Sequence, residues 1–344
     1  MLSSSVLTDK RIDRQSNLEI LRIFSMLLIV LGHSIVHGNL VNSSLIYNEL
    51  SLVGLELGSR IGVNCFVLIS GYFMVQSNYK REKLYSLLIQ ILTYSLTITY
   101  GLIILGVIPF SLKNMIYAVL PTITSQYWFA TAYVLLYLLM PYLQILVKSM
   151  TQKQHFNLIL ILLFMWSVIP TLLLGSPGYS NLGWLICIWL IAAYIRLYHD
   201  SIDSIKVWHG LISLLVIVVI TVCTYYIGKD SIFIQQNVVY LFAEMNKVPA
   251  VICSLLLFLG FKNLQMKSSP ALNNIAACTF GVYLFHDNPQ IRSFLWEYLC
   301  HNQNYINSPL LVVRIIICST LVFTSGIVVE MLRKRLIKNI KRMG

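Results

Sequence analysis

The sequence predicts an all-α, polytopic integral membrane protein, and three observations support this fold class. Hydrophobic residues make up 57% of the chain and charged residues only 11%. Several apolar runs are long enough to cross a bilayer as helices. Lys and Arg outnumber Asp and Glu by 25 to 13, which gives a formal net charge of +12, and most of these basic residues lie in short connections between the apolar runs. That distribution is typical of membrane topology and does not indicate binding to nucleic acid.

About ten transmembrane helices follow from the order of the apolar runs. We expect a single transmembrane domain over residues 1–344, with a polar cytoplasmic tail at 1–16 and a basic cytoplasmic tail at 333–344. The expected spans are Leu18–Val36, Leu57–Val75, Leu84–Leu105, Tyr127–Val147, Phe156–Leu174, Leu182–Leu197, Gly210–Ile227, Val248–Phe261, Leu272–Phe285 and Leu310–Met331.

Helix stops and interfacial residues mark the ends of these spans. No small-residue cleavage site follows the first span, so we expect it to be retained in the protein. Pro109 follows the third span, and Tyr127 and Trp128 begin the fourth as interfacial aromatics. The Gly-Ser-Pro-Gly stretch at 175–178 predicts a turn after the fifth span. The ninth span is short and rich in small residues.

The distribution of basic residues predicts that both termini are cytoplasmic. Of the 25 Lys and Arg residues, eighteen lie on the side of the N-terminus, and Arg22 lies within the first span. The six on the other side are Arg60, Lys113, Lys229, Lys247, Arg292 and Arg314. An excess of positive charge marks the cytoplasmic side, and an even number of spans returns the chain to it.

The first span carries Arg22 and His33, which are eleven residues apart. At about 100° per residue they lie on one helix face, about 16 Å apart along the axis. Charged residues inside a span are costly and are hypotheses for a functional site. Glu19, three residues before Arg22, can pair with it on the same face.

Two clusters follow from this topology. Lys80, Arg81 and Lys83 would lie at the cytoplasmic mouth with Arg22, and the outer cluster would lie at the level of His33. The outer residues are Arg60, Asn64, His286 and Asp287. A basic inner mouth is suited to an anionic cytosolic donor such as a coenzyme A phosphate, and a buried His is suited to acid–base catalysis. The pantetheine arm could span the distance between the clusters.

Structural interpretations of the same residues remain open. His33 could be a buried His bonded to a backbone carbonyl, Arg22 could serve only to pair with Glu19, and Lys80–Lys83 could be only a topological anchor. His37, one turn after His33, suggests a metal pair, but two His without a third ligand are poor support, and no Cys spacing indicates a metal site. We therefore expect no metal.

Five segments, in order along the chain, resemble motifs of the membrane acyltransferase family 3. The first is NLEILRIFSMLLIVLGH, with Glu19, Leu21-Arg22, and His33 eleven residues after the Arg. The other four are CFVLISGYFM with Ser70-Gly71-Tyr72, the basic loop Lys80-Arg81-Lys83, YWFATAYVLLYLLMP with Trp128, Tyr137 and Pro141, and FGVYLFHDNP with Gly281, Tyr283 and His286.

The resemblance implies transfer of an acyl group, usually acetyl, from cytosolic acyl-coenzyme A to a hydroxyl of an envelope or exported glycan or a lipid-linked sugar. Acyl-coenzyme A would be a co-substrate, with no permanently bound cofactor, and the protein would lie in a bacterial-type plasma membrane. Nothing in the sequence specifies an oligomeric state. His33 would be catalytic and Arg22, Lys80, Arg81 and Lys83 would bind the donor. Supporting or substrate-binding roles would fall to Glu19, Arg60, Asn64, Trp128, His286 and Asp287.

One departure from the family pattern affects the catalytic acids. Many members have consecutive acidic residues in the Trp-containing helix, where this chain has Tyr133 and Val134. Their role is either absent here or taken by Asp287 or Glu244. A transporter or flippase for a glycan, a lipid-linked sugar or an acyl group is the alternative function, because intramembrane charges can also line a transport pathway.

Overall fold

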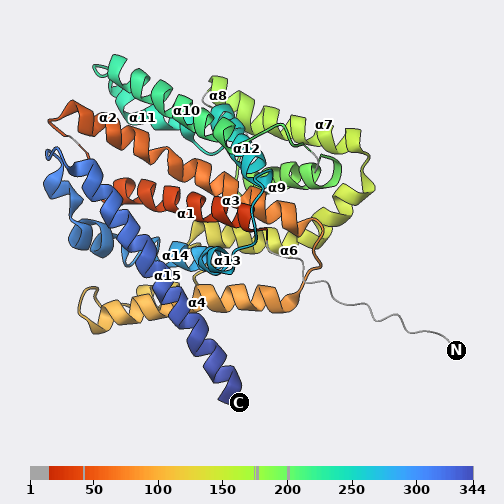
Figure 1. The fold of residues 1–344 in the computed structure, drawn as a ribbon. Coiled ribbons are helices and arrows are strands. Elements are labelled where there is room, and N and C mark those ends of the chain that lie inside the picture. The colour runs from red at the N-terminus through yellow and green to blue at the C-terminus, as the bar shows by residue number, and fades with distance from the viewer. Residues whose placement is uncertain (1–14, 42, 174, 176–177, 200–201, 344) are drawn as a thin grey trace.

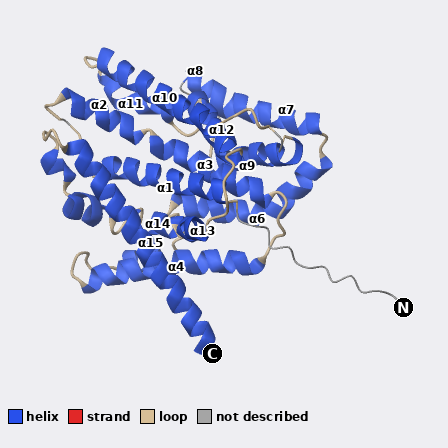
Figure 2. Cartoon of the chain, viewed as in Figure 1, coloured by secondary structure: helices blue, strands red, loops and turns tan. Residues whose placement is uncertain are grey.

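In the computed structural model, every regular element of the described chain is a helix, as predicted (Figure 2). The structure describes residues 15–41, 43–173, 175, 178–199 and 202–343. Most of the expected polar tail 1–16, and residues 176 and 177 of the expected turn, fall outside these ranges. The helices are α1 (Ser16–Val36), α2 (Ile46–Glu56), α3 (Gly58–Met74), α4 (Arg81–Ile104), α5 (Leu112–Val119), α6 (Trp128–Ser149), α7 (Gln152–Leu163), η1 (Phe164–Val168), α8 (Ile169–Leu173), α9 (Asn181–Tyr198), α10 (Val207–Ile227), α11 (Ile232–Ala243), α12 (Val248–Lys262), α13 (Pro270–Ala276), α14 (Thr279–His286), η2 (Phe294–Cys300), η3 (Asn302–Tyr305) and α15 (Leu311–Met343).

Helices α1 and α3 pack against each other in the centre of the bundle, and α1 also contacts α2, α12, α13, α14 and α15 (Figure 1). The two central helices approach closely because small residues face the partner. A Cβ atom on Gly62 of α3 would lie 2.6 Å from the Ser25 carbonyl oxygen of α1. In a bilayer the hydrophobic effect does not drive helices together, so their association depends on close van der Waals packing. Small residues at the contact allow the two backbones to pack closely. The first span is thus fixed in the core of the fold.

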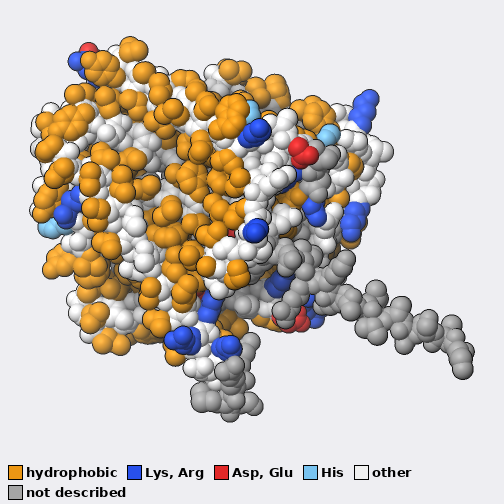
Figure 3. Space-filling view, in the orientation of Figure 1, with side chains coloured by type: hydrophobic (Ala, Val, Ile, Leu, Met, Phe, Trp, Pro, Cys, Tyr) orange, Lys and Arg blue, Asp and Glu red, His pale blue; other side chains and the backbone are white. Residues whose placement is uncertain are grey.

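Nine helical segments of the described chain are long and apolar enough to cross a membrane, which confirms the polytopic fold class. They are Ser16–Val36, Ile46–Met74, Arg81–Ile104, Trp128–Ser149, Gln152–Leu173, Asn181–Tyr198, Val207–Ile227, Ile232–Lys262 and Leu311–Asn339. Hydrophobic side chains cover most of the face seen in Figure 3, and Lys and Arg lie mainly at its right and lower edges. The orientation of the termini stays a prediction.

The expected ninth span is divided into two short helices, α13 and α14. The Ser16 hydroxyl donates to Asn273 at 2.9 Å, which places α13 beside the beginning of α1. His286, the last residue of α14, lies 3.0 Å from His33 near the other end of α1. The interrupted pair therefore runs beside α1 from one end to the other. It is not among the nine segments that are long and apolar enough to cross a membrane, so a tenth crossing at this place stays a prediction. We name the two ends of the bundle the Ser16 end and the His33 end.

A second interruption separates α11 from α12 at residues 244–247. Pro170 of α8 has no N–H and cannot donate to the carbonyl of Trp166, four residues before it. The Asn246 side chain donates to that carbonyl at 2.9 Å, and the Lys247 ammonium donates to the Pro170 carbonyl at 2.5 Å. Two residues of the interruption thus satisfy carbonyls at the irregular end of α7–α8, which fixes the position of Glu244 beside them.

Candidate active site

His33 and His37 lie at the end of α1 and on one face of it. They are four residues apart, so their rings come together, with ring centroids 4.8 Å apart. The His33 side chain is 19% exposed and lines a cavity. Because α1 is continuous from Ser16 to Val36, the interval of about 16 Å between Arg22 and His33 holds along its axis.

His286 and Asp287 meet these two residues because α14 ends beside α1. The Nδ1 atom of His33 lies 3.0 Å from His286 Nε2 and 3.5 Å from Asp287 Oδ1. His37 Nε2 lies 3.1 Å from the same carboxylate oxygen. Both His286 and Asp287 are almost completely buried. The structure thus brings together three residues that were predicted for the site and adds His37 to them.

Hydrogen bonds indicate which ring nitrogen carries the proton in His286 and in His33. His286 Nδ1 lies 2.7 Å from the Val282 carbonyl oxygen, which only accepts, so Nδ1 must carry the proton. Nε2 of the neutral His286 ring is then an acceptor, and His33 donates to it from Nδ1. This leaves the lone pair of His33 on Nε2, which makes no hydrogen bond within the described residues. His33 is therefore held in the tautomer that can act as a base at Nε2.

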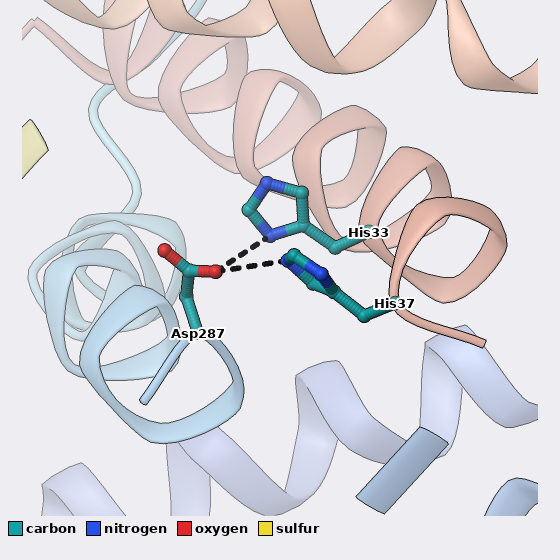
Figure 4. A group of neighbouring side chains, drawn as sticks. All are labelled: His33, His37 and Asp287. Carbon is teal, nitrogen blue, oxygen red and sulfur yellow. Dashed lines mark hydrogen bonds and ion pairs between the residues drawn. The ribbon is translucent and has the colours of Figure 1, made fainter. Parts of the chain in front are cut away.

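Asp287 is held in place by Arg292 as well as by His37. Arg292 Nη2 lies 2.8 Å and Nε 3.1 Å from Oδ1, and Nε also donates to the Asp287 backbone carbonyl. Burial acts to raise the pKa of the Asp287 carboxyl, but interactions with His33, His37 and Arg292 outweigh it and lower that pKa below its ordinary value. Asp287 is therefore ionised at neutral pH. In Figure 4, His33 and His37 both point toward it, and the second nitrogen of His33 points away.

His33, His37 and Asp287 also form a group whose ligand atoms lie within 4.8 Å of one another, a spacing that a metal ion could bridge. Two features favour a hydrogen-bonded network instead. The Arg292 guanidinium contacts the oxygen that would bind the metal, and a divalent cation there would face this positive charge. His33 Nδ1, the ring nitrogen of His33 that faces Asp287, is already hydrogen-bonded to His286.

A cavity of about 520 Å³ opens beside His33, within the size range of small-molecule sites. It is formed where α1 ends, where α3, α6 and α9 begin, and where α11 and α12 are interrupted. Arg60 and Trp128, both predicted for the site, line it. Arg60 forms an ion pair with Glu244, which also lines the cavity.

At the Ser16 end, Arg22 lies 3.3 Å from Glu19 and 5.6 Å from the centre of the Phe66 ring. The predicted pair with Glu19 is present. Nε of Arg22 is buried and makes no hydrogen bond within the described residues, so a donor group remains for an anion. Lys80, Arg81 and Lys83 are exposed at the same end, in and after the connection from α3 to α4.

Asn64 was expected in the outer cluster, but its side chain is part of the structural framework. It donates to the Met245 carbonyl at 2.7 Å and accepts from the Trp184 indole at 3.0 Å, which joins α3 to the α11–α12 interruption. Sequence reasoning did not assign Arg292 to the site. The only local signal was its position five residues after Asp287.

Comparison with known proteins gives one match. A family model described as an acyltransferase domain, that of acyltransferase family 3, matches residues 15–329. No curated protein and no solved structure gives a significant match. The matched range begins at the first described residue before α1 and ends within α15, so it includes every residue of the site.

Proposed function

Because the chain belongs to acyltransferase family 3 and is a membrane acyltransferase, we propose that it moves an acetyl group from acetyl-coenzyme A in the cytosol to a hydroxyl of an envelope or exported glycan. The observation that supports this proposal is the tautomer and the orientation of the His33 ring. Its ring is fixed through Nδ1, and its Nε2 is left as a base beside a cavity. Such a base is what an alcohol needs in order to attack a thioester.

The donor would approach from the Ser16 end, which the excess of positive charge predicts to be the cytosolic end. The buried, unbonded Nε–H of Arg22 favours contact with a phosphate, and Lys80, Arg81 and Lys83 add positive charge around the same opening. From Arg22 the thioester must reach about 16 Å along α1 to meet His33, a distance that the extended pantetheine arm can cover.

The chemical step follows from the orientation of His33. The acceptor hydroxyl enters through the cavity, and its oxygen attacks the thioester carbonyl while Nε2 takes the hydroxyl proton. The carbon–sulfur bond then breaks, and the leaving thiolate of coenzyme A takes the proton from the imidazolium. Asp287 stabilises the imidazolium, because it is ionised and lies 3.5 Å from Nδ1. An acyl-His intermediate, formed by attack of Nε2 itself, is the variant that we rank second.

Two variants test the proposal in membranes supplied with radiolabelled acetyl-coenzyme A. We expect His33→Ala to abolish transfer of label to glycan and Arg22→Ala to raise the concentration of donor needed. His199→Ala, at the far end of α9, is the matched control. Undiminished glycan labelling in the His33 variant would overturn the proposal.

Transport remains the second candidate, because interrupted helices such as α11–α12 and α13–α14 also form the substrate sites of transporters. A carrier for a glycan, a lipid-linked sugar or an acyl group need not cleave a thioester. Release of free coenzyme A that depends on a glycan acceptor and on His33 would distinguish the enzyme from a carrier.

A further inference from the structure

Besides His33 and His37, the lining of the cavity includes a polar group that has no hydrogen-bond partner among the described residues. Tyr179, in the connection before α9, lines the cavity, and its hydroxyl is buried without a hydrogen bond among the described residues. Burial raises the pKa of this hydroxyl, so it is a neutral group that can donate and accept. A buried hydroxyl without a partner costs free energy, and a ligand in the cavity would relieve that cost.

Charged and aromatic side chains surround this hydroxyl. Tyr179 interacts electrostatically with Glu244, Arg60 and Tyr240, all of which line the cavity. Tyr240 and Trp128 offer ring faces, and the Arg60–Glu244 pair offers both donors and acceptors. Flat apolar faces next to such groups are complementary to a sugar, whose ring has apolar C–H faces and a rim of hydroxyls.

The charges of the Asp, Glu, Lys and Arg side chains that line the cavity balance. Arg60 is positive, and Glu244, its ion-pair partner, is negative. An anionic sugar would therefore meet no excess of positive charge that could offset the loss of its hydration. The balance favours an acceptor without charge.

We propose that Tyr179, Arg60 and Glu244 form an acceptor subsite that binds an uncharged sugar unit of the glycan and excludes units that carry a carboxylate or a phosphate. This inference rests on the proposed function and deepens it. The hydroxyl of Tyr179 bonds to a sugar hydroxyl, and the Arg60–Glu244 pair binds further hydroxyls on the rim. The subsite holds the acceptor so that a neighbouring hydroxyl faces His33 Nε2.

The test uses the purified full-length chain in lipid nanodiscs with acetyl-coenzyme A. The acceptor probes are the methyl glycosides of glucose, N-acetylglucosamine and glucuronic acid, and glucose 1-phosphate. We expect the neutral glycosides to stimulate release of coenzyme A at least tenfold more efficiently, as kcat/KM, than either anionic probe. Equal or better use of an anionic probe, or no stimulation by either neutral glycoside, would overturn the subsite.

Variants separate the subsite from the chemistry. Tyr179→Phe removes only the hydroxyl, and we expect the KM for the neutral glycoside to rise about fivefold to tenfold. The KM for acetyl-coenzyme A, whose phosphates bind at the Ser16 end in the proposed function, should not change. Tyr298→Phe, which alters an exposed tyrosine, is the matched control. An unchanged glycoside KM in Tyr179→Phe would refute the role of the hydroxyl.

The Glu244→Gln variant distinguishes a role of Glu244 in sugar selection from a purely structural role. This change removes the carboxylate that forms the ion pair with Arg60, so the lining of the cavity gains a net positive charge. We expect the ratio of kcat/KM for the glucuronide to kcat/KM for the neutral glycosides to rise at least tenfold. An equal loss of kcat/KM for all probes would contradict the inference. Hydrolysis of acetyl-coenzyme A that depends on His33 but not on any sugar reports on the proposed function separately. If that hydrolysis is present and the sugar preference is absent, only the subsite fails.

Discussion

Replacing Asp287 by Asn should slow the acyl transfer without weakening donor binding. Asn keeps the shape of the side chain but removes the charge that stabilises the His33 imidazolium formed when Nε2 takes the proton. For unit charges at the observed 3.5 Å, Coulomb's law with an effective dielectric constant of about 20 gives about 5 kcal/mol. That energy corresponds to at most about three and a half powers of ten in rate.

Part of this stabilisation remains in the variant, because the Asn amide oxygen can still accept from His33 Nδ1. The Arg292 guanidinium, 2.8 Å from the same Asp287 oxygen, repels the imidazolium in both proteins and does not change the difference between them. We therefore expect kcat to fall about 10²-fold to 10³-fold, with the KM for acetyl-coenzyme A unchanged. The assay is release of coenzyme A by membranes that contain the endogenous acceptor. Asp230→Asn, at an exposed position, controls for the loss of an acidic side chain. A loss of less than threefold in a folded Asp287→Asn protein would refute the assigned role of Asp287.

Three further outcomes are expected. Arg22→Gln should raise the Kd for coenzyme A, measured by calorimetry, about tenfold or more, because a charge-assisted hydrogen bond to phosphate is lost; an unchanged Kd would place the phosphates elsewhere. Incubation with a strong chelator should leave the transfer rate unchanged, because Arg292 holds the oxygen that a metal would need; loss of activity that zinc restores would show a metal site instead. Gly71→Ala should cost about 1–3 kcal/mol and lower the thermal midpoint in detergent, because the new Cβ would lie 2.9 Å from the Ala192 Cβ. Gly101→Ala, with nothing within 4 Å, should not lower it.

The sequence alone was sufficient to predict the fold class and the face of the first span. Apolar runs of spanning length reveal helices without knowledge of their neighbours, and eleven residues between Arg22 and His33 place both on one face of any straight helix. The division of 270–286 into α13 and α14 could not be predicted in this way. It depends on tertiary partners such as Ser16, which bonds to Asn273.

Only part of the candidate site could be predicted, because some of its residues can be recognised locally and others depend on tertiary contacts. His33, His286 and Asp287 belong to motifs that can be recognised locally, and they meet in the structure. The contribution of Arg292 depends on how the chain turns after α14, and the structural role of Asn64 depends on where the α11–α12 interruption lies. Polar residues in spans cannot be sorted into cavity lining and framework until their partners are known.

The division of the expected ninth span into two short helices has a consequence for biogenesis. Helices α13 and α14 have seven and eight residues, far fewer than the roughly 20 that a lone helix needs in order to leave the translocon for lipid. The backbone groups at the break must be satisfied by protein before they can lie at membrane depth. We therefore expect this segment to enter the bilayer late, together with α15 and against an α1 that is already in place. His286 and Asp287 would reach His33 only at that last step, so an incompletely inserted chain would lack the assembled candidate site.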